Sequence, residues 1–482
     1  MKSSTAQQPE AREVGVAKAN GKPTKNLSLA LPKQPASKAD PADPAAAFLR
    51  RYKRDGVSCL QFHRGTFMQW KGGCYREALV EEVRSELVQS FKQGWSGIRR
   101  SNVSDVLEHV KSEIMLPGSV DSPTWIGEKP RGFDPDECLA TRSAIIHLPS
   151  FVTNRQPSIV AATPRFFTTA ATDFDLDLDP PKPATWLDFL DSQWCDDQQS
   201  IDTLQELMGY LLTSDTRQQK IFMVVGPKRS GKGTIARIIR GVVGEANISA
   251  PTLAGLSTNF GLAPLIGKSV AIISDARLSG RPDQGVIVER LLSISGEDAQ
   301  TIDRKFQPAV TCKLPTRFVV ISNELPRLND ASTAVVSRVV LLHTTQSFYG
   351  REDQSLTEKL LGELPGILLW AIQGWQRLRQ RGYFIQPESA LDSLTEMADL
   401  ASPVSAFIED CCEISPAESV VIADLFEAWK QWCRIQGREK QAGNAQSFGR
   451  DLFAAETSIR RVRPGTDGKR QRVYEGIGLK CQ

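Results

Sequence analysis

The chain has 482 residues, of which 40% are hydrophobic and 24% are charged, and its formal net charge is +3. This length exceeds what one core supports, so we expect two to four domains of ordinary soluble composition. The small net charge excludes a uniformly basic or acidic protein, so any nucleic-acid surface must be local. No apolar run approaches the roughly 20 residues that span a bilayer, and we expect no membrane segment.

Cysteine and histidine usage argues against a zinc centre and against a disulfide framework. Nine cysteines are scattered along the chain without a C-x-x-C pair, and there are only four histidines. The N-terminal sequence MKSSTAQQPEAREVG lacks the apolar core of a signal peptide. A reducing cytoplasm fits these features best.

The first 180 residues predict a tail followed by a small domain. Residues 1–46 are rich in Lys, Pro, Ala, Ser and Gln and predict a disordered tail. Ser104 with Asp105 is expected to cap a helix. Residues 47–180 predict a mixed α/β domain with a hairpin near 62–75, helices over 77–91 and 103–115, and strands over 144–147 and 159–162.

A phosphate-binding loop is predicted in the middle of the chain. Ile221–Val225 has the length and β-branched content of a buried strand, and apolar residues recur at helical spacing from Ile235 to Val242. Between them lie the proposed nucleotide-binding residues Gly226, Pro227, Lys228, Arg229, Ser230, Gly231, Lys232, Gly233 and Thr234. An ordinary glycine-rich turn is the alternative, but the strand before and the helix after disfavour it.

Each part of this loop has a physical role toward a nucleoside triphosphate. The glycines let successive N–H groups turn inward, the helix N-terminus adds a positive dipole, and Lys232 brings a full charge to the β- and γ-phosphates. The usual motif has Ser or Thr directly after the lysine, where Gly233 stands. Either Thr234 takes over as the Mg²⁺ ligand or water mediates the contact. The sequence therefore predicts ATP and Mg²⁺ binding.

Further strands and helices predict a three-layer α/β sandwich within residues 181–400. In such sheets ligands bind beyond the carboxyl ends of the strands, and Gly226, Asp275 and Asn323 fall at such ends. Asp275 is expected to hold Mg²⁺, and Asn323 to orient the attacking water; turn-forming or capping roles are the alternatives. Glu297 or Asp298 is a candidate for the water-activating base. The remaining elements are helices over 186–193, 200–212 and 283–295, and strands over 270–273, 317–323 and 339–342.

Two basic features flank this core. Arg338 directly precedes the last strand, which suits an arginine finger reaching a neighbouring subunit; a surface ion pair is the alternative. Residues 301–314 predict a hairpin whose turn carries Arg304, Lys305 and Phe306. Cations beside an aromatic ring suit a DNA phosphate and a stacked base, with a plain solvent-exposed hairpin as an equally weighted alternative.

Residues 401–482 predict a winged-helix-like DNA-binding domain. Helices over 404–412, 421–436 and 446–455 are followed by a hairpin over 459–463 and 472–477. Its basic residues are favoured as DNA contacts over a merely solvated face: Arg461, Arg463, Lys469, Arg470 and Arg472.

The ordered motifs GPKRSGKGT, LIGKSVAIISDAR, RFVVISNELPRL and STAVVSRVVLLH resemble superfamily 3 helicases of phages, plasmids and large DNA viruses. The resemblance is nearest to the helicase part of the phage/plasmid primase–helicase family, related to the poxvirus primase–helicase, and covers about residues 55–400. It implies an AAA+-like core that forms a homo-hexameric ring around single-stranded DNA. A bacterial host or a virus-infected cell would be the setting.

The resemblance also implies roles for individual residues. Asp275 matches the Walker B acid, Asn323 the sensor, Arg338 the arginine finger, and Arg304 with Lys305 the hairpin that moves DNA. Three departures affect the metal and the base: Gly233 replaces a hydroxyl residue, Asp275 stands where Glu is common, and Arg338 is single where a pair is common. No primase domain of the family's type precedes the helicase part, so a separate primase or polymerase is an expected partner.

The sequence thus favours an ATP-dependent DNA helicase that acts in replication of a phage, plasmid or integrated mobile element, with the C-terminal domain contacting a duplex origin. One alternative is an ATP-binding replication initiator without robust unwinding. A nucleotide kinase is less favoured, because GKGT also occurs in nucleoside monophosphate kinases but leaves Asn323 and the basic hairpins unexplained.

Overall fold

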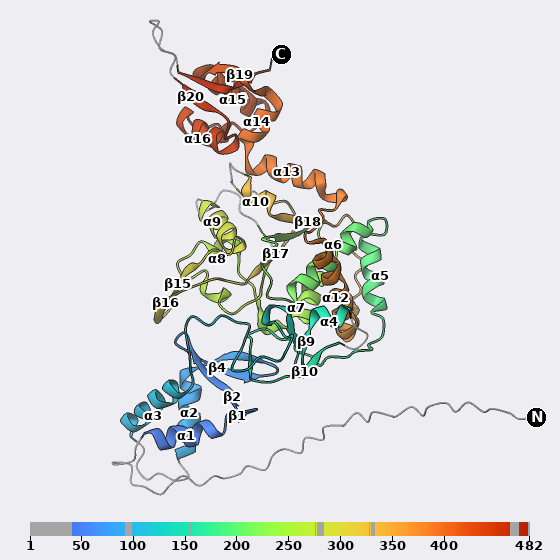
Figure 1. Cartoon of the computed structure of the whole chain (residues 1–482). Helices are drawn as coiled ribbons and strands as arrows, with labels where there is room; N and C mark the ends of the chain where they lie inside the picture. The colour runs from blue at the N-terminus through green and yellow to red at the C-terminus, as the bar shows by residue number, and fades with distance from the viewer. Residues whose placement is uncertain are drawn as a thin grey trace, which may run out of the picture.

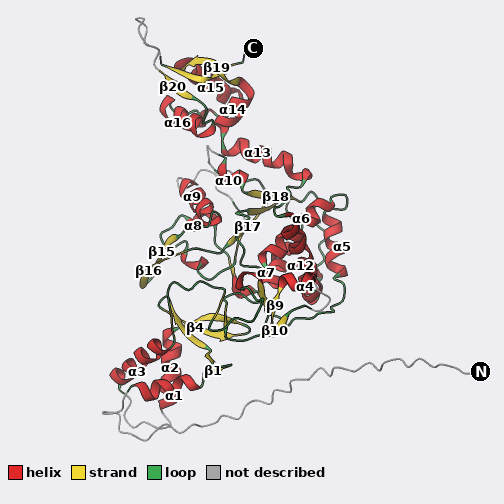
Figure 2. Cartoon of the chain, viewed as in Figure 1, coloured by secondary structure: helices red, strands yellow, loops and turns green. Residues whose placement is uncertain are grey.

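The computed structural model describes residues 41–91, 99–153, 157–274, 276, 284–326, 328, 333–462 and 472–480. They form an N-terminal unit, a central unit and a C-terminal unit, and Figure 1 shows the first and last at opposite ends of the central one. All three units contain both helices and strands (Figure 2). No helix within these ranges combines the length and the apolar character needed to cross a membrane.

The N-terminal unit has three helices packed on a four-stranded sheet ordered β5-β4-β3-β6. Its first helix begins at Ala42, inside the predicted disordered tail, because Ala45 and Phe48 are buried in this core. The predicted cap at Ser104 is wrong: Ser104 lies within a helix and donates to the Arg100 carbonyl. The elements are α1 (Ala42–Arg50), β3 (Leu60–His63), β4 (Thr66–Lys71), β5 (Cys74–Ala78), α2 (Val80–Phe91), α3 (Arg100–Glu113) and β6 (Met115–Leu116).

Short strands then connect this sheet to the central unit around a second small core that contains Trp125, Phe133 and Phe166. The strands predicted over 144–147 and 159–162 are confirmed as β9 and β10. The elements are β1 (Lys53–Arg54), β2 (Val57–Ser58), β7 (Thr124–Trp125), β8 (Cys138–Ala140), β9 (Ala144–His147), α4 (Leu148–Thr153), β10 (Ile159–Ala161) and β11 (Phe166–Phe167).

The central unit is built on an all-parallel five-stranded sheet with the order β13-β14-β17-β12-β18. Four of these strands follow the predicted apolar runs closely. The fifth, at the edge, is only two residues long and is a strand that the sequence did not predict. The strands are β12 (Ile221–Val225), β13 (Ile248–Ser249), β14 (Val270–Ser274), β17 (Arg317–Ser322) and β18 (Val339–His343).

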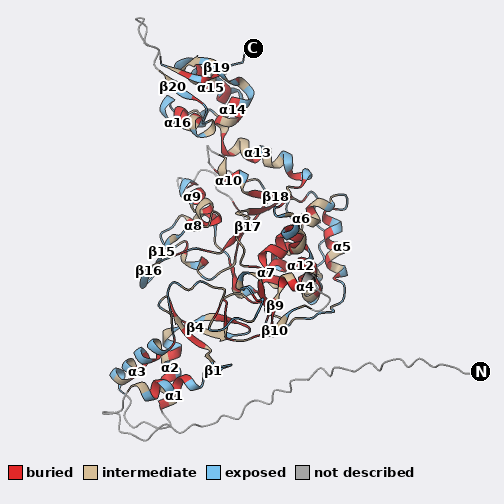
Figure 3. Ribbon diagram, in the orientation of Figure 1, coloured by how far each residue is buried: buried red, intermediate tan, exposed pale blue. Residues whose placement is uncertain are grey.

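Helices cover both faces of this sheet, so the predicted three-layer arrangement is confirmed. Side chains alternate along β12: Phe222 and Val224 join the core on one face, while Ile221, Met223 and Val225 join the core on the other. Figure 3 shows the sheet strands as the buried centre. One face carries α5 (Ala184–Gln193), α6 (Gln198–Leu211), α7 (Lys232–Val243), α11 (Leu356–Gly362) and α12 (Leu364–Arg381); the other carries α8 (Leu253–Leu256), α9 (Gln284–Ser295), α10 (Ala334–Ser337) and α13 (Leu391–Ala401).

Helices α6 and α12 approach each other closely enough to need glycine at their contact. A Cβ atom built at Gly209 would lie 2.2 Å from the Ala371 carbonyl oxygen, and one at Gly374 would lie 2.3 Å from the Gln205 carbonyl oxygen. Beside this contact the carboxylate of Glu206, which is 2% exposed, accepts hydrogen bonds from Arg377 and Arg381 of α12. Backbone contact and ion pairs therefore join the two helices.

The C-terminal unit has the three predicted helices, and its three-stranded sheet is ordered β19-β21-β20. Trp429 stacks on Trp432 and on Phe448 in its core. The sequence did not predict the long strand β19, whose side chains are mostly exposed or half-buried and which includes Pro416. The elements are α14 (Pro403–Cys411), β19 (Cys412–Val421), α15 (Ile422–Ile435), α16 (Ala445–Ala455), β20 (Arg460–Val462) and β21 (Val473–Leu479).

Candidate nucleotide-binding site

The predicted phosphate-binding loop joins the end of β12 to the start of α7, as the sequence pattern predicts. A Cβ atom at Gly226 would lie 2.1 Å from the carbonyl oxygen and the Oγ1 atom of Thr344. Gly231 has φ +80°, and a Cβ atom there would lie 2.9 Å from the ring of Phe189 in α5. Only glycine fits these two positions, because neighbouring chain segments touch the loop backbone.

Lys232 folds back over the loop that precedes it. Its side chain is 5% exposed, and Nζ donates to the Gly226 carbonyl oxygen (2.8 Å), the Pro227 carbonyl oxygen (2.6 Å) and Ser230 Oγ (3.0 Å). Burial lowers the pKa of this ammonium group. A buried positive charge that is held only by neutral oxygens favours an anion in the same place.

The segment after β18 holds the loop from the other side. Thr344 Oγ1 lies 2.8 Å from Ser230 Oγ, and the backbone N–H of Phe348 donates to the Arg229 carbonyl oxygen at 2.9 Å. Ser347 Oγ donates to the Lys228 carbonyl oxygen at 2.9 Å. These contacts were not predicted from the sequence, although Thr344 follows a strand end just as Gly226 and Asn323 do. That position is the signal that would have identified it.

Gly233 and Thr234 lie in the first turn of α7. Gly233 is exposed with nothing within 4 Å of an added Cβ atom, so no packing demands glycine there. Thr234 is half-buried, and its backbone N–H donates to the Gly231 carbonyl oxygen at 2.9 Å. Its hydroxyl is thus close to Lys232 in the chain and at the helix N-terminus, where a phosphate-bound Mg²⁺ would need a ligand.

Strand register places Asn323 beside the first residue of the phosphate-binding loop. Ser322 pairs with Val225 in adjacent parallel strands, so the next residues along, Asn323 and Gly226, are neighbours beyond the carboxyl ends. Asn323 is exposed. Asp275, the predicted metal ligand, lies outside the described residues. Within the described ranges, no group of three or more His, Cys, Asp or Glu side chains is arranged to hold a metal ion.

Arg338 lies at the amino ends of the strands, opposite the phosphate-binding loop. Its carbonyl oxygen accepts from Ile221, the first residue of β12, and Nη1 donates to the Leu292 carbonyl oxygen and to Ser295 Oγ (2.9 Å) at the end of α9. Because the strands are parallel, their amino ends are a full strand length away from the loop of the same chain. Arg338 therefore lies away from the phosphate-binding loop of its own chain.

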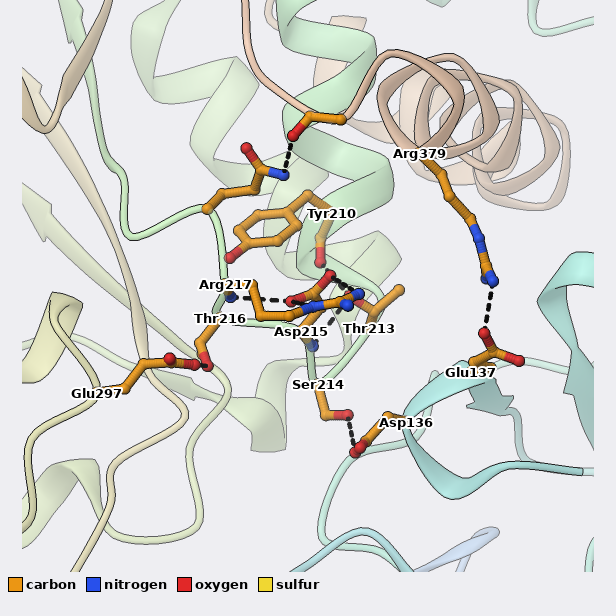
Figure 4. A network of polar contacts seen from close by, with 12 residues as sticks. Asp136, Glu137, Tyr210, Thr213, Ser214, Asp215, Thr216, Arg217, Glu297 and Arg379 are labelled. Carbon is orange, nitrogen blue, oxygen red and sulfur yellow. Dashed lines mark hydrogen bonds and ion pairs between the residues drawn. The ribbon is translucent and has the colours of Figure 1, made fainter.

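Glu297 also lies on this far side, so it does not sit beside the phosphate-binding loop. Figure 4 shows its carboxylate accepting from Thr216, in the connection between α6 and β12. In the same network Asp136 accepts from Ser214 and Glu137 from Arg379, which ties the connecting segment between β7 and β8 to the central unit. Burial alone would raise the pKa of Glu137, but hydrogen bonds from Arg379 and His147 outweigh it and hold that pKa below its ordinary value.

This network lines a cleft of about 1380 Å³ between the N-terminal unit, the connection after α6 and the hairpin of β15 (Gln300–Arg304) and β16 (Gln307–Cys312). Its walls carry both signs of charge, with Arg64, Arg304 and Lys313 near the hairpin and Asp136, Glu137 and Glu297 in the network. Because the amino ends of the strands face it, the cleft is separate from the phosphate-binding loop.

The hairpin presents two of its three predicted contact residues outward. Phe306 is 94% exposed, and Lys305 Nζ lies 5.1 Å from the centre of its ring. Arg304 instead donates to the carbonyl oxygens of Pro308 and of Arg64 in the N-terminal unit, at 2.9 to 3.2 Å. Arg304 therefore joins the hairpin to the N-terminal unit, which its position in the sequence did not predict.

The basic C-terminal residues are described in part. Arg461 is exposed on β20, and Arg472 is exposed next to β21. Arg463, Lys469 and Arg470 lie outside the described residues. The two strands pair in antiparallel register, so the predicted hairpin is confirmed on the side that can be described.

Comparison with known proteins gives a family match over part of the chain and a likeness of fold over most of it. Residues 224–338 match a family of unknown function, DUF5906. The apo structure of the NrS-1 C-terminal region (305–718) has a TM-score of 0.53 at 11% identity, covering 92% of this chain and 100% of that one. Two further apo structures of that region, both of its A form, have TM-scores of 0.48 and 0.47 at 12% and 13% identity, with 91% and 92% of this chain and 100% of each covered. The chain therefore shares its mixed α/β fold with the NrS-1 C-terminal region.

Proposed function

We propose that the protein is an ATP-dependent DNA helicase with an AAA+-like core of superfamily 3, acting in replication of a phage, plasmid or integrated mobile element. The observation that carries the proposal is the buried ammonium group of Lys232 within a loop that leads from a parallel strand into the N-terminus of a helix. This arrangement suits a triphosphate, whose oxygens would replace the three oxygens that Lys232 now contacts.

The loop would bind the phosphates as follows. Backbone N–H groups at the start of α7 point toward the anion, and Lys232 exchanges its contacts with Gly226, Pro227 and Ser230 for phosphate oxygens. Mg²⁺ would be held by Thr234 and Asp275, and when bound it neutralises charge on the β- and γ-phosphates. Asn323 lies beside Gly226 by strand register, which suits a side-chain amide that orients the attacking water.

DNA would be engaged by the exposed residues of the hairpin and of the C-terminal unit. Lys305 and Phe306 offer a cation and a stacking surface, as binding of single strands requires. Arg461 and Arg472 lie on the hairpin of a unit with three helices, and we assign this unit as a winged-helix domain that contacts duplex DNA.

The position of Arg338 supports assembly into a ring. Arg338 lies at the amino ends of the strands, away from the loop of its own subunit, so its charge serves catalysis only if it reaches the nucleotide of a neighbouring copy. We therefore propose a homo-hexamer in which Arg338 acts in trans. Priming would come from a separate primase or polymerase.

The test is ATP hydrolysis with and without single-stranded DNA, followed by strand displacement. The wild-type protein should show DNA-stimulated hydrolysis, Lys232→Ala should lose it, and Lys359→Ala, which changes an exposed lysine of α11, should retain it. ATP and DNA binding without hydrolysis would instead support a replication initiator that uses ATP as a structural ligand. No ATP binding would overturn the proposal.

A further inference from the structure

Glu324 is exposed and lies beyond the carboxyl ends of the sheet strands, on the same side as the phosphate-binding loop. Ser322, the last residue of β17, pairs with Val225, the last residue of β12. Adjacent strands lie about 4.8 Å apart, so Asn323 and Glu324 emerge beside Gly226, the first residue of the loop. The carboxylate is thus on the side of the sheet where nucleotide chemistry would take place.

The backbone of Glu324 is anchored on both sides. Ser322 Oγ donates to the Glu324 carbonyl oxygen at 2.6 Å and accepts from the Glu324 N–H at 3.4 Å, forming a tight turn directly after the strand. Leu325 is half-buried against the core and Pro326 is buried. The exposed side chain therefore projects from a backbone whose position the sheet determines, which is what a catalytic group needs.

The other carboxylates considered for this role do not follow the carboxyl end of the strand next to the loop. Glu297 contacts Thr216 on the side of the amino ends of the strands. The Asp298 N–H donates to the Ser293 carbonyl oxygen at the end of α9, which places Asp298 next to Glu297. Glu352 pairs with Arg229 at 3.5 Å and lies nine residues beyond the end of β18, so it does not directly follow a strand of the sheet. Among the residues that the structure describes, strand register therefore points to Glu324.

We propose that Glu324 is the general base of ATP hydrolysis, an inference that rests on the proposed ATPase function. The Glu324 carboxylate takes a proton from the water molecule that Asn323 orients, while the water oxygen forms a bond to the γ-phosphorus. The bond between the γ-phosphorus and its bridging oxygen breaks, and ADP leaves with the electron pair. The exposed carboxylic acid then returns the proton to solvent, which regenerates the carboxylate.

The test is the isosteric substitution Glu324→Gln, with Glu297→Gln as the matched control. A positioned base contributes about 10²- to 10⁴-fold to a rate, so E324Q should lose hydrolysis by that factor. Binding of a fluorescent ATP analogue should be unchanged, and the nucleotide recovered from E324Q after incubation should remain a triphosphate. E297Q should hydrolyse ATP at the wild-type rate, because Glu297 lies near the amino ends of the strands, on the side away from the phosphate-binding loop.

Hydrolysis by E324Q at the wild-type rate would overturn the inference and leave the proposed function standing. Failure of the wild-type protein to bind ATP would overturn the proposed function itself. Glu324→Asp keeps the charge and shortens the reach, so it should fold and show a rate between those of the wild type and E324Q. A wild-type rate for E324D together with an unfolded E324Q would assign Glu324 a structural role and overturn the inference.

Discussion

Replacing Gly209 by alanine should destabilise the central unit by separating α6 from α12. The added methyl group would lie 2.2 Å from the Ala371 carbonyl oxygen and 2.6 Å from the Trp375 backbone nitrogen. Both are backbone atoms within helices, so neither can rotate away as a side chain could. Overpacking of a core typically costs about 1–3 kcal/mol, and we expect the upper end because two rigid helices must shift.

A cost of about 3 kcal/mol lowers the melting temperature by roughly 6–12 °C for a unit of this size, at about 2–4 °C per kcal/mol. The assay is thermal unfolding followed by circular dichroism. Gly362→Ala in α11 is the matched control, since an added Cβ atom there meets nothing within 4 Å and its φ is not positive. Alanine at that helical position should be neutral or slightly stabilising. Equal melting temperatures for G209A and G362A would refute the assignment of Gly209 to a close helix contact.

Three further predictions concern exposed or paired groups. Phe306→Ala should leave folding unchanged and weaken binding of single-stranded DNA by about 1–3 kcal/mol in fluorescence anisotropy at fixed salt, whereas affinity equal to that of a Tyr383→Ala control would exclude stacking at the hairpin. The pKa of Glu137 is lower in the folded state than its unfolded-state value of about 4.3, so its ion pair stabilises the fold above that pH, and this stability is lost as the pH falls through the folded-state pKa. The difference in melting temperature between the wild type and Arg379→Met should therefore vanish in acid. A difference that stays constant with pH would contradict this prediction. Arg338→Ala subunits mixed with wild-type subunits should reduce ATPase activity more than in proportion, and a strictly proportional loss would exclude a trans role.

Periodicity was sufficient to predict four of the five strands of the central sheet. The runs at Ile221–Val225 and Val339–Leu342 are apolar because a parallel sheet is buried on both faces, and such runs are recognisable without a structure. The two-residue edge strand Ile248–Ser249 and the exposed strand Cys412–Val421 carry no such signal. Their strand conformation depends on the partners they pair with, which sequence periodicity does not report.

The candidate site was predictable where its residues follow strand ends and not where its contacts are long-range. Asn323 was placed beside Gly226 by the rule that ligands bind at the carboxyl ends of parallel strands, and strand register bears this out. Glu297 was a candidate base only because it is near the core in sequence, and its contact with Thr216 assigns it to the other edge. Whether a loop residue lies at the amino or the carboxyl ends of the strands depends on where the loop returns to the sheet. No local sequence pattern contains that information.

The contact that Arg304 makes with Arg64 has a mechanical consequence. Within the described part of the chain, the strands β15 and β16 pair only with each other, so the hairpin that they form has no further strand to hold it. Here the guanidinium at its turn fastens it to the β3–β4 turn of the N-terminal unit, a segment more than two hundred residues earlier in the chain. A displacement of the hairpin must therefore either break this hydrogen bond or carry the β3–β4 turn with it, which couples the hairpin to the N-terminal unit.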